Sequence, residues 1–349
     1  MKTRVEKIDR TNINMDAIRA AGEILKRGGL VAFPTETVYG LGANALDEEA
    51  ARKTYAAKGR PSDNPLIVHI AQLEDLRAIA RQVPDKALIL ARTFWPGPLT
   101  MIFDKSGIVP DGTTGGLDTV AVRMPDNPAA LALIRAAGGY VSGPSANTSG
   151  RPSPTTAQHV REDLDGKIDM ILDCGPVEIG VESTIVDMTV EPPMILRPGA
   201  VTKEMLEEAV GEVAVDHTIL TADSKTPPKA PGMKYRHYAP RAEMVVVEGP
   251  LERVTARIRS LAAEQEARGH RTGIIATEET VGRYDHGNVK CIGTREDEST
   301  VAANLYAVLR EFDADGTEYI YSEAFDEGGI GHAVMNRLLK AAGHHVIQV

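Results

Sequence analysis

The chain has 349 residues, and at roughly 150 residues per domain this length predicts about two domains. Charged residues make up 25% and hydrophobic residues 42% of the composition, which excludes a mainly disordered or fibrous chain. The formal net charge of -10 argues against strong direct binding of nucleic acid through a broad basic face, so any anion-binding site must be local.

The first part of the chain alternates helical patterns with short apolar runs. Asn14 is placed to cap a helix that ends at Gly28, because asparagine accepts hydrogen bonds from unpaired amides and glycine readily leaves the helical conformation. Asp47 and Gly59 delimit a second helix, over residues 48–58, in the same way. Further helices are predicted at residues 73–81, 85–93 and 128–137. Strands are predicted at residues 30–33, 66–70, 99–103, 119–123, 168–173, 184–188 and 194–196.

Several of these strands follow one another without an intervening helix. Parallel neighbours require a long crossover, whereas consecutive strands commonly pair antiparallel. The fold class predicted for residues 1–215 is therefore α/β, with a twisted mixed sheet and helices.

The last third of the chain has a different pattern. Residues 216–241 are predicted to be a linker, because most of this stretch is polar, rich in proline and without periodicity. From residue 242 to 349 strands and helices alternate, which predicts a smaller, Rossmann-like parallel α/β domain. Strands are predicted at residues 245–247, 273–276, 289–292, 318–321 and 346–349, and helices at residues 251–266, 301–312 and 333–341.

Cysteine usage and hydropathy predict the compartment. Cys174 and Cys291 are far apart and belong to no metal-binding pattern, so the sequence supports neither a disulfide framework nor a metal site. No run of about 18 apolar residues occurs, and the N-terminus lacks the apolar core of an export signal. We expect a cytoplasmic protein that does not cross a membrane.

The common nucleotide-binding motifs are not found in this sequence. No P-loop pattern occurs anywhere in the chain. Gly40-Leu41-Gly42-Ala43 loosely matches a dinucleotide fingerprint, but Pro34 ends the preceding strand too early for that motif. We therefore predict that these glycines form a turn.

Six polar, turn-rich segments stand at the ends of predicted strands, where α/β proteins commonly build their sites. Their cations and hydroxyl groups are the donors that bind phosphate, and rigid proline and glycine turns favour a site. Scattered surface ion pairs are the alternative interpretation. The cations are Lys58, Arg60, Arg151 and Arg197, and the hydroxyl groups belong to Thr35, Thr37, Ser145, Ser153 and Ser183.

Arg123 and His69 are ionisable residues on predicted strands and are candidate site residues. Alternation along residues 119–123 places Thr119 and Arg123 on one face of the sheet. An inward-facing arginine requires an anion, which is either a carboxylate side chain or the carboxylate of a ligand. His69 lies near the end of the strand at 66–70 and is either a buried histidine bonded to backbone or a ligand contact.

Two separated motifs resemble one known family. Lys58-Gly59-Arg60 with Ser145-Ala146-Asn147 resembles the K-x-R and S-x-N motifs of the YrdC/Sua5 family, the L-threonylcarbamoyladenylate synthases. Trp95-Pro96-Gly97-Pro98 and Leu196-Arg197-Pro198-Gly199 are similar to that family as well, and the likeness covers nearly the whole chain. The segment 231–240 and the second α/β domain resemble the long, two-domain Sua5 form.

The resemblance implies a reaction and a domain plan. L-threonine and bicarbonate would give a carbamate whose oxygen attacks the α-phosphate of ATP, which releases pyrophosphate and leaves threonylcarbamoyl-AMP. This is the first step of t6A formation at position 37 of tRNA, so the chain would be a nucleotidyltransferase that passes its product to the tRNA threonylcarbamoyl transferase complex. A YrdC-like catalytic domain would occupy residues 1–215 and a Sua5 C-terminal domain residues 242–349. Because no carboxylate cluster shows itself, we expect Mg2+ to arrive with ATP.

The resemblance also implies roles for individual residues. Lys58 and Arg60 would be catalytic, because bringing two anionic reactants together requires cations that neutralise charge and fix geometry. Tyr235 would belong to a lid, formed by the linker at 216–241, that excludes water from the intermediate. The residues that would bind ATP are Arg60, Asn64, Thr119, Ser145, Asn147, Ser153, Arg197 and Tyr235. The residues that would bind L-threonine are Thr37, His69, Arg123, Gly143 and Ser183, with Arg123 at its carboxylate.

Two other function classes compete with this interpretation. An RNA-binding module could use a concave basic surface, but the net charge of -10 and an aromatic content of 4% disfavour it. Carbamoyl transfer as in hydrogenase maturation, where a YrdC-like domain also occurs, would need zinc-finger segments that two isolated cysteines cannot supply. Release of pyrophosphate that depends on threonine discriminates among the three.

Overall fold

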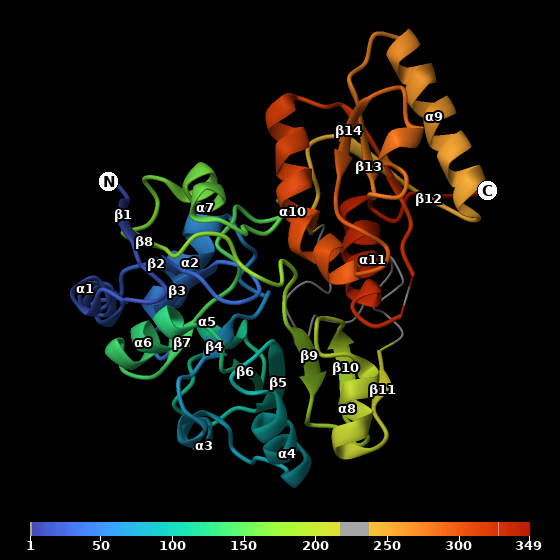
Figure 1. Ribbon diagram of the computed structural model, residues 1–349. Helices are drawn as coiled ribbons and strands as arrows, with labels where there is room; N and C mark the ends of the chain where they lie inside the picture. Colours follow the sequence, from blue (N-terminus) through green and yellow to red (C-terminus); the bar gives the residue numbers. More distant parts are fainter. Residues whose placement is uncertain (1, 217–236, 327) are drawn as a thin grey trace. The chain divides into compact units, whose positions relative to one another are not determined.

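The computed structural model describes residues 2–216, 237–326 and 328–349 (Figure 1). They form two compact units. Unit 1 holds the described residues up to 216 except Gly150–Pro152, which group with the described residues from 237 onward in unit 2. Most of the predicted linker, including Tyr235, lies outside the described residues, and so does the lid predicted there.

Unit 1 is built on one mixed sheet, as the sequence predicts. The strand order is β1-β8-β2-β3-β7-β4-β6-β5-β9-β10-β11. Some neighbours, such as β4 and β6, run parallel, and others, such as β5 and β6, run antiparallel. The strands are β1 (Arg4–Lys7), β2 (Val31–Phe33), β3 (Gly40–Asn44), β4 (Ile67–His69), β5 (Leu99–Asp104), β6 (Thr119–Arg123), β7 (Val141–Ser142), β8 (Met170–Asp173), β9 (Thr184–Asp187), β10 (Met194–Arg197) and β11 (Ala214–Val215).

Two helices of unit 1 begin after the predicted capping residues, and the second also ends at the predicted glycine. The side chain of Asn14 accepts hydrogen bonds from the amides of Asp16 and Ala17, and Gly59 ends the second helix with a left-handed φ of 61°. The helix predicted at 73–81 is shorter than expected, because Ala80 is extended and forms a β-bridge with Lys105. The helices are α1 (Met15–Lys26), α2 (Glu48–Lys58), α3 (Leu76–Ile79), α4 (Asp85–Phe94), α5 (Asp111–Thr114), α6 (Pro128–Ala136), α7 (Ala157–Leu164) and α8 (Lys203–Val210).

The glycine turn predicted around Gly40 is wrong, because this segment is strand β3. A Cβ atom on Gly42 would lie 2.9 Å from the carbonyl oxygen of Val31, and one on Gly40 would lie 3.0 Å from the ring of Phe33. The glycines therefore let β3 pack closely against β2, and they do not bend the chain.

Unit 2 is a parallel α/β domain, which confirms the predicted Rossmann-like class. Its sheet has the strand order β14-β13-β15-β12-β16, and its paired strands run parallel. Helix α9 (Leu251–Ala267) lies on one side of this sheet and α10 (Glu298–Asp315) on the other, and α11 (Gly331–Ala341) precedes the last strand (Figure 1). The strands are β12 (Glu243–Glu248), β13 (Thr272–Ala276), β14 (Asn288–Cys291), β15 (Tyr319–Glu323) and β16 (Val346–Gln348).

The cysteines differ in environment. Cys174, in unit 1, is buried, and burial raises the pKa of its thiol to about 11. Cys291 ends β14 in unit 2 and is exposed. Within the ranges that the structure describes, no helix has the length and apolar character needed to cross a membrane.

Candidate functional site

Strand directions bring several predicted site residues to one edge of the larger sheet. Parallel strands β4 and β6 pair His69 with Arg123, so both final residues share one register position. Following the pairings from β6 through β5 and β9 to β10 shows that β10 runs in the same direction as β6. Arg197 at the end of β10 therefore reaches the same edge, and so does Ser183 just before β9.

The two motifs of the family resemblance meet in unit 1. Lys58 is the last residue of α2 and is 1% exposed. Its Nζ donates hydrogen bonds to the carbonyl oxygens of Ser145 and Asn147, the second at 2.6 Å. These contacts join residues 87 and 89 positions apart in the sequence. A buried ammonium group is thus held beside the loop that follows β7.

Arg60 organises the loop that follows α2. Its Nε donates to the carbonyl oxygen of Asn64 at 3.1 Å, and its Nη2 donates to that of Pro65 at 3.0 Å. The side-chain Oδ1 of Asn64 is buried and accepts no hydrogen bond from a described residue. This oxygen is an acceptor that a ligand could satisfy.

Arg123 is buried, with hydrogen bonds from two guanidinium nitrogens and an ion pair at the third. Nε donates to the carbonyl oxygen of Gly97 at 3.2 Å, and Nη1 donates to Oγ1 of Thr37 at 2.9 Å. Nη2 lies 2.6 Å from Oε1 of Glu36 in a buried ion pair. The sequence left open whether a side chain or a ligand supplies the anion for Arg123, and in this structure Glu36 supplies it.

Sequence reasoning did not single out Glu36 as a functional residue. The signal was its place beside Thr37, in the polar segment that follows the strand at 30–33. Glu36 is 87 residues from Arg123 in the sequence, and nothing local in the sequence indicates that the two will pair.

Ser183 contacts a residue predicted to bind ATP. Arg197 donates from Nε to the carbonyl oxygen of Ser183 at 3.0 Å and from Nη2 to its Oγ at 3.2 Å. The same hydroxyl group lies 2.8 Å from Oγ1 of Thr100, a residue that the sequence analysis did not select. The predicted threonine-binding and ATP-binding groups are therefore adjacent.

Three other residues of the sequence analysis lie in different surroundings. Ser153 donates to Oε1 of Glu182 at 2.5 Å, and both side chains are buried. Thr119 begins β6, four residues and therefore about 13 Å along the strand from Arg123. Arg151 groups with unit 2, where its Nη2 lies 3.5 Å from Oδ2 of Asp313.

His69 is a neutral side chain in this structure. Burial, and then the charge of Arg123, lower the pKa of its imidazole from 6.5 to about 3. Its Nδ1 is buried and makes no hydrogen bond to a described residue. A Cβ atom on Gly143 would lie 2.8 Å from this ring, so the glycine leaves room for the imidazole.

The depressed pKa of His69 predicts a pH dependence of stability. The unfolded chain takes up a proton below about pH 6.5 that folded His69 takes up only near pH 3, so the folded state loses stability as pH falls between these values. For one group this loss is at most about 1.4 kcal/mol per pH unit. In His69→Gln, we expect the free energy of unfolding to fall less between pH 7 and pH 5.

This prediction can be tested in the full chain with a fluorescent probe that lies in unit 1. Trp95 is the chain's single tryptophan, and its buried indole donates to the carbonyl oxygen of Leu99 at 2.7 Å. Urea unfolding followed by its fluorescence at several pH values gives the two curves. Parallel curves for the wild type and His69→Gln would contradict the assigned neutral imidazole.

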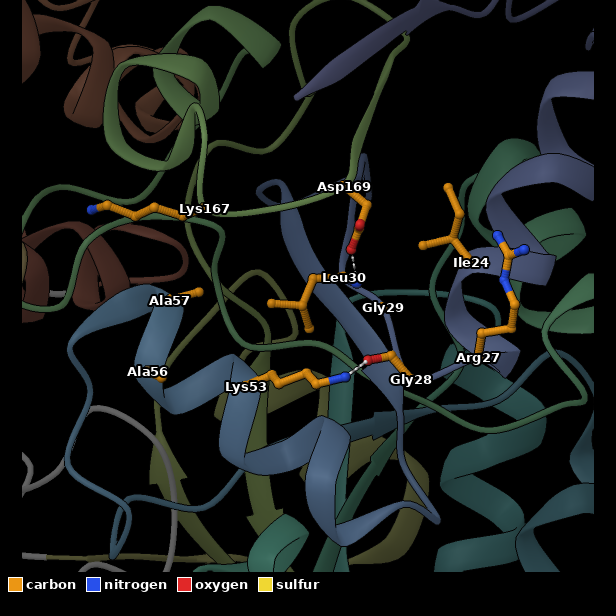
Figure 2. Close-up of a pocket in the computed structure, with 10 residues that line it drawn as sticks. All are labelled: Ile24, Arg27, Gly28, Gly29, Leu30, Lys53, Ala56, Ala57, Lys167 and Asp169. Carbon is orange, nitrogen blue, oxygen red and sulfur yellow. Dashed lines mark hydrogen bonds between the residues drawn. The ribbon is translucent and has the colours of Figure 1, made fainter. Parts of the chain in front are cut away.

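A separate pocket of about 580 Å³ in unit 1 contains none of the predicted site residues (Figure 2). Lys53 Nζ donates to the carbonyl oxygen of Gly28 at 2.8 Å, and Asp169 accepts from the amide of Leu30 at 2.8 Å. In Figure 2 the amine of Lys167 points away from Lys53. The polar groups of this pocket therefore hold the chain around the end of α1.

Among the described residues, no group of three or more His, Cys, Asp or Glu side chains could hold a metal ion.

The fold and the site together define an α/β protein with buried cations and hydroxyl groups at one edge of its larger sheet. The chain belongs to the Sua5/YciO/YrdC family, which confirms the resemblance seen in the sequence. The family model described as "Telomere recombination" matches residues 23–199. A second model, described as "Threonylcarbamoyl-AMP synthase, C-terminal domain", matches residues 201–343, as expected for the two-domain form.

Relatives of known name match nearly the full chain. The threonylcarbamoyl-AMP synthase of Pyrococcus abyssi is 50% identical over 332 residues, which is 95% of this chain and 96% of that protein. The threonylcarbamoyl-AMP synthase of Bacillus subtilis is 48% identical over the full length of both chains. A crystal structure of P. abyssi Sua5 complexed with L-threonine matches with a TM-score of 0.95 and 47% identity, covering 99% of this chain and 100% of that one.

Proposed function

We propose that the chain makes threonylcarbamoyl-AMP from L-threonine, bicarbonate and ATP, with release of pyrophosphate, as the first step of t6A formation at position 37 of tRNA. The observation that carries this proposal is the contact of Lys58 with Ser145 and Asn147, which joins two motifs far apart in the sequence. Relatives that match nearly the whole chain have the name of this activity.

The proposed chemistry requires cations near both reactants. The α-ammonium group of threonine loses a proton, and its nitrogen bonds to the carbon of bicarbonate with loss of water. A carbamate oxygen then attacks the α-phosphorus as pyrophosphate leaves. Arg123 and Thr37 are proposed to hold threonine, and Lys58 and Arg197 to face ATP. Each cation is buried, where a hydrogen bond to an anion is stronger than in water.

The finer assignments are part of the same proposal. The enzyme class would be a nucleotidyltransferase, and Mg2+ would enter bound to the phosphates of ATP. We propose that ATP is held by Arg60, Asn64, Thr119, Ser145, Asn147, Ser153, Arg197 and Tyr235, and L-threonine by Thr37, His69, Arg123, Gly143 and Ser183. The product would pass to the tRNA threonylcarbamoyl transferase complex in the cytoplasm.

The test is pyrophosphate release by the full chain, with L-threonine and bicarbonate each present or omitted. We expect release only when both are present, because ATP is attacked by the carbamate and not by water. Coupled detection of pyrophosphate gives the rate. Release at the same rate with and without threonine, or no release in any mixture, would exclude the proposed function. An RNA-binding module would then be the alternative function.

A further inference from the structure

We propose that Glu36 binds the α-ammonium group of L-threonine, so that Glu36 and Arg123 together recognise the substrate as a zwitterion. This inference rests on the proposed function, because it assumes that the carboxylate of threonine docks on Arg123. It adds a binding residue that the family motifs in the sequence did not indicate.

The first support is the state of the Glu36 carboxylate. It is 6% exposed, and neither Oε1 nor Oε2 accepts a hydrogen bond from a described residue. Among the residues that the structure describes, its ion-pair partner is Nη2 of Arg123, which lies 2.6 Å from Oε1. A buried carboxylate normally accepts several hydrogen bonds, so this one has acceptor capacity that a ligand with several N–H donors would satisfy.

The second support is the position of Glu36 beside Arg123. The guanidinium is oriented by two neutral partners, the carbonyl oxygen of Gly97 and the hydroxyl group of Thr37, as well as by Glu36. In an α-amino acid the carboxylate and the ammonium are attached to the same carbon atom. A ligand whose carboxylate lies on Arg123 therefore places its ammonium within a few ångströms of the neighbouring carboxylate.

The third support is the cavity that Glu36 lines. It encloses about 180 Å³, and its lining contains the acids Glu36, Asp126 and Glu178 but the single cation Arg10. Arg10 Nη1 lies 3.1 Å from Oε1 of Glu178, so this cation already has an acidic partner. The lining does not include Arg123, so the cavity shows that the surroundings of Glu36 are acidic, and such surroundings favour an ammonium group over a second carboxylate.

The experiment compares two ligands that differ only in the ammonium group. Calorimetry measures the dissociation constants of L-threonine and of 3-hydroxybutyrate, which keeps the carboxylate and the hydroxyl group. For the wild type we expect threonine to bind about 10- to 100-fold more tightly. In Glu36→Gln this ratio should fall to near one, mainly through weaker binding of threonine.

Other outcomes overturn the inference in distinguishable ways. If the wild type binds threonine and Glu36→Gln keeps the ratio, Glu36 does not contact the ammonium group. If both ligands bind the variant more tightly, Glu36 is a competitor for Arg123, and if both bind more weakly by the same factor, its role is structural. If the wild type does not bind threonine at all, the proposed function itself fails.

Two further variants keep the test decisive. Glu49→Gln removes an exposed acid of unit 1 that lies outside this cavity, and we expect it to leave the ratio unchanged. Should Glu36→Gln fail to fold by Trp95 fluorescence, Glu36→Asp keeps the negative charge on a shorter side chain. An intermediate ratio in Glu36→Asp supports the inference, and a ratio equal to that of the wild type contradicts it.

Discussion

Lys58→Ala is expected to lower threonine-dependent pyrophosphate release by about 100- to 1000-fold. The substitution removes a buried positive charge from the site proposed to face the phosphates of ATP. It also leaves the carbonyl oxygens of Ser145 and Asn147 without the donor that joins this loop to α2. Both effects act on the reaction at the same place, so we expect one of the largest losses of activity in the chain.

Initial rates of pyrophosphate release at saturating ATP measure this loss. Lys53→Ala is the matched control, because Lys53 lies on the same helix, is exposed, and donates to the backbone of Gly28 away from the predicted site. The control should retain most of the activity. A Lys58→Ala variant with the rate of the control would remove Lys58 from the mechanism.

Arg123→Met is expected to abolish the use of threonine and to destabilise unit 1 by about 3 to 5 kcal/mol. The variant loses the group proposed to bind the substrate carboxylate. It also leaves Glu36 buried without its counter-ion, and an uncompensated buried charge is strongly unfavourable.

A second substitution separates these two effects. In the double variant Arg123→Met/Glu36→Leu the buried charge is gone, so the free energy of unfolding should recover by several kcal/mol while threonine-dependent release stays absent. Urea unfolding followed by Trp95 fluorescence measures the first quantity, and pyrophosphate release measures the second. Recovery of activity in the double variant would show that Arg123 does not bind the substrate.

Local chemistry explains why much of the fold could be predicted. Helix α2 begins after Asp47 and ends at Gly59, because a capping carboxylate and a left-handed glycine act on their immediate neighbours. In β6, Val120 and Val122 pack in one core cluster and Ala121 in another, as alternation predicts. Such signals depend on residues within a few positions of one another.

The contacts missed by sequence reasoning join distant residues. Gly40 and Gly42 indicated a turn, and only the presence of Phe33 and Val31 on the neighbouring strand explains why glycine is required there. The pairing of Glu36 with Arg123 depends likewise on the order in which distant strands assemble. The sequence correctly indicated the polar segment that contains Glu36, but not the partner that this residue would meet.

The unequal exposure of the cysteines leaves Cys291 as a site for a dye in unit 2, and the tryptophan provides a second reporter in unit 1. Cys174 is buried with a raised pKa, so an alkylating dye at neutral pH should attach to Cys291 in unit 2. The chain's single tryptophan, Trp95, lies in unit 1. Resonance energy transfer from this native indole to the dye would therefore follow the distance between the units during turnover, without any engineered residue.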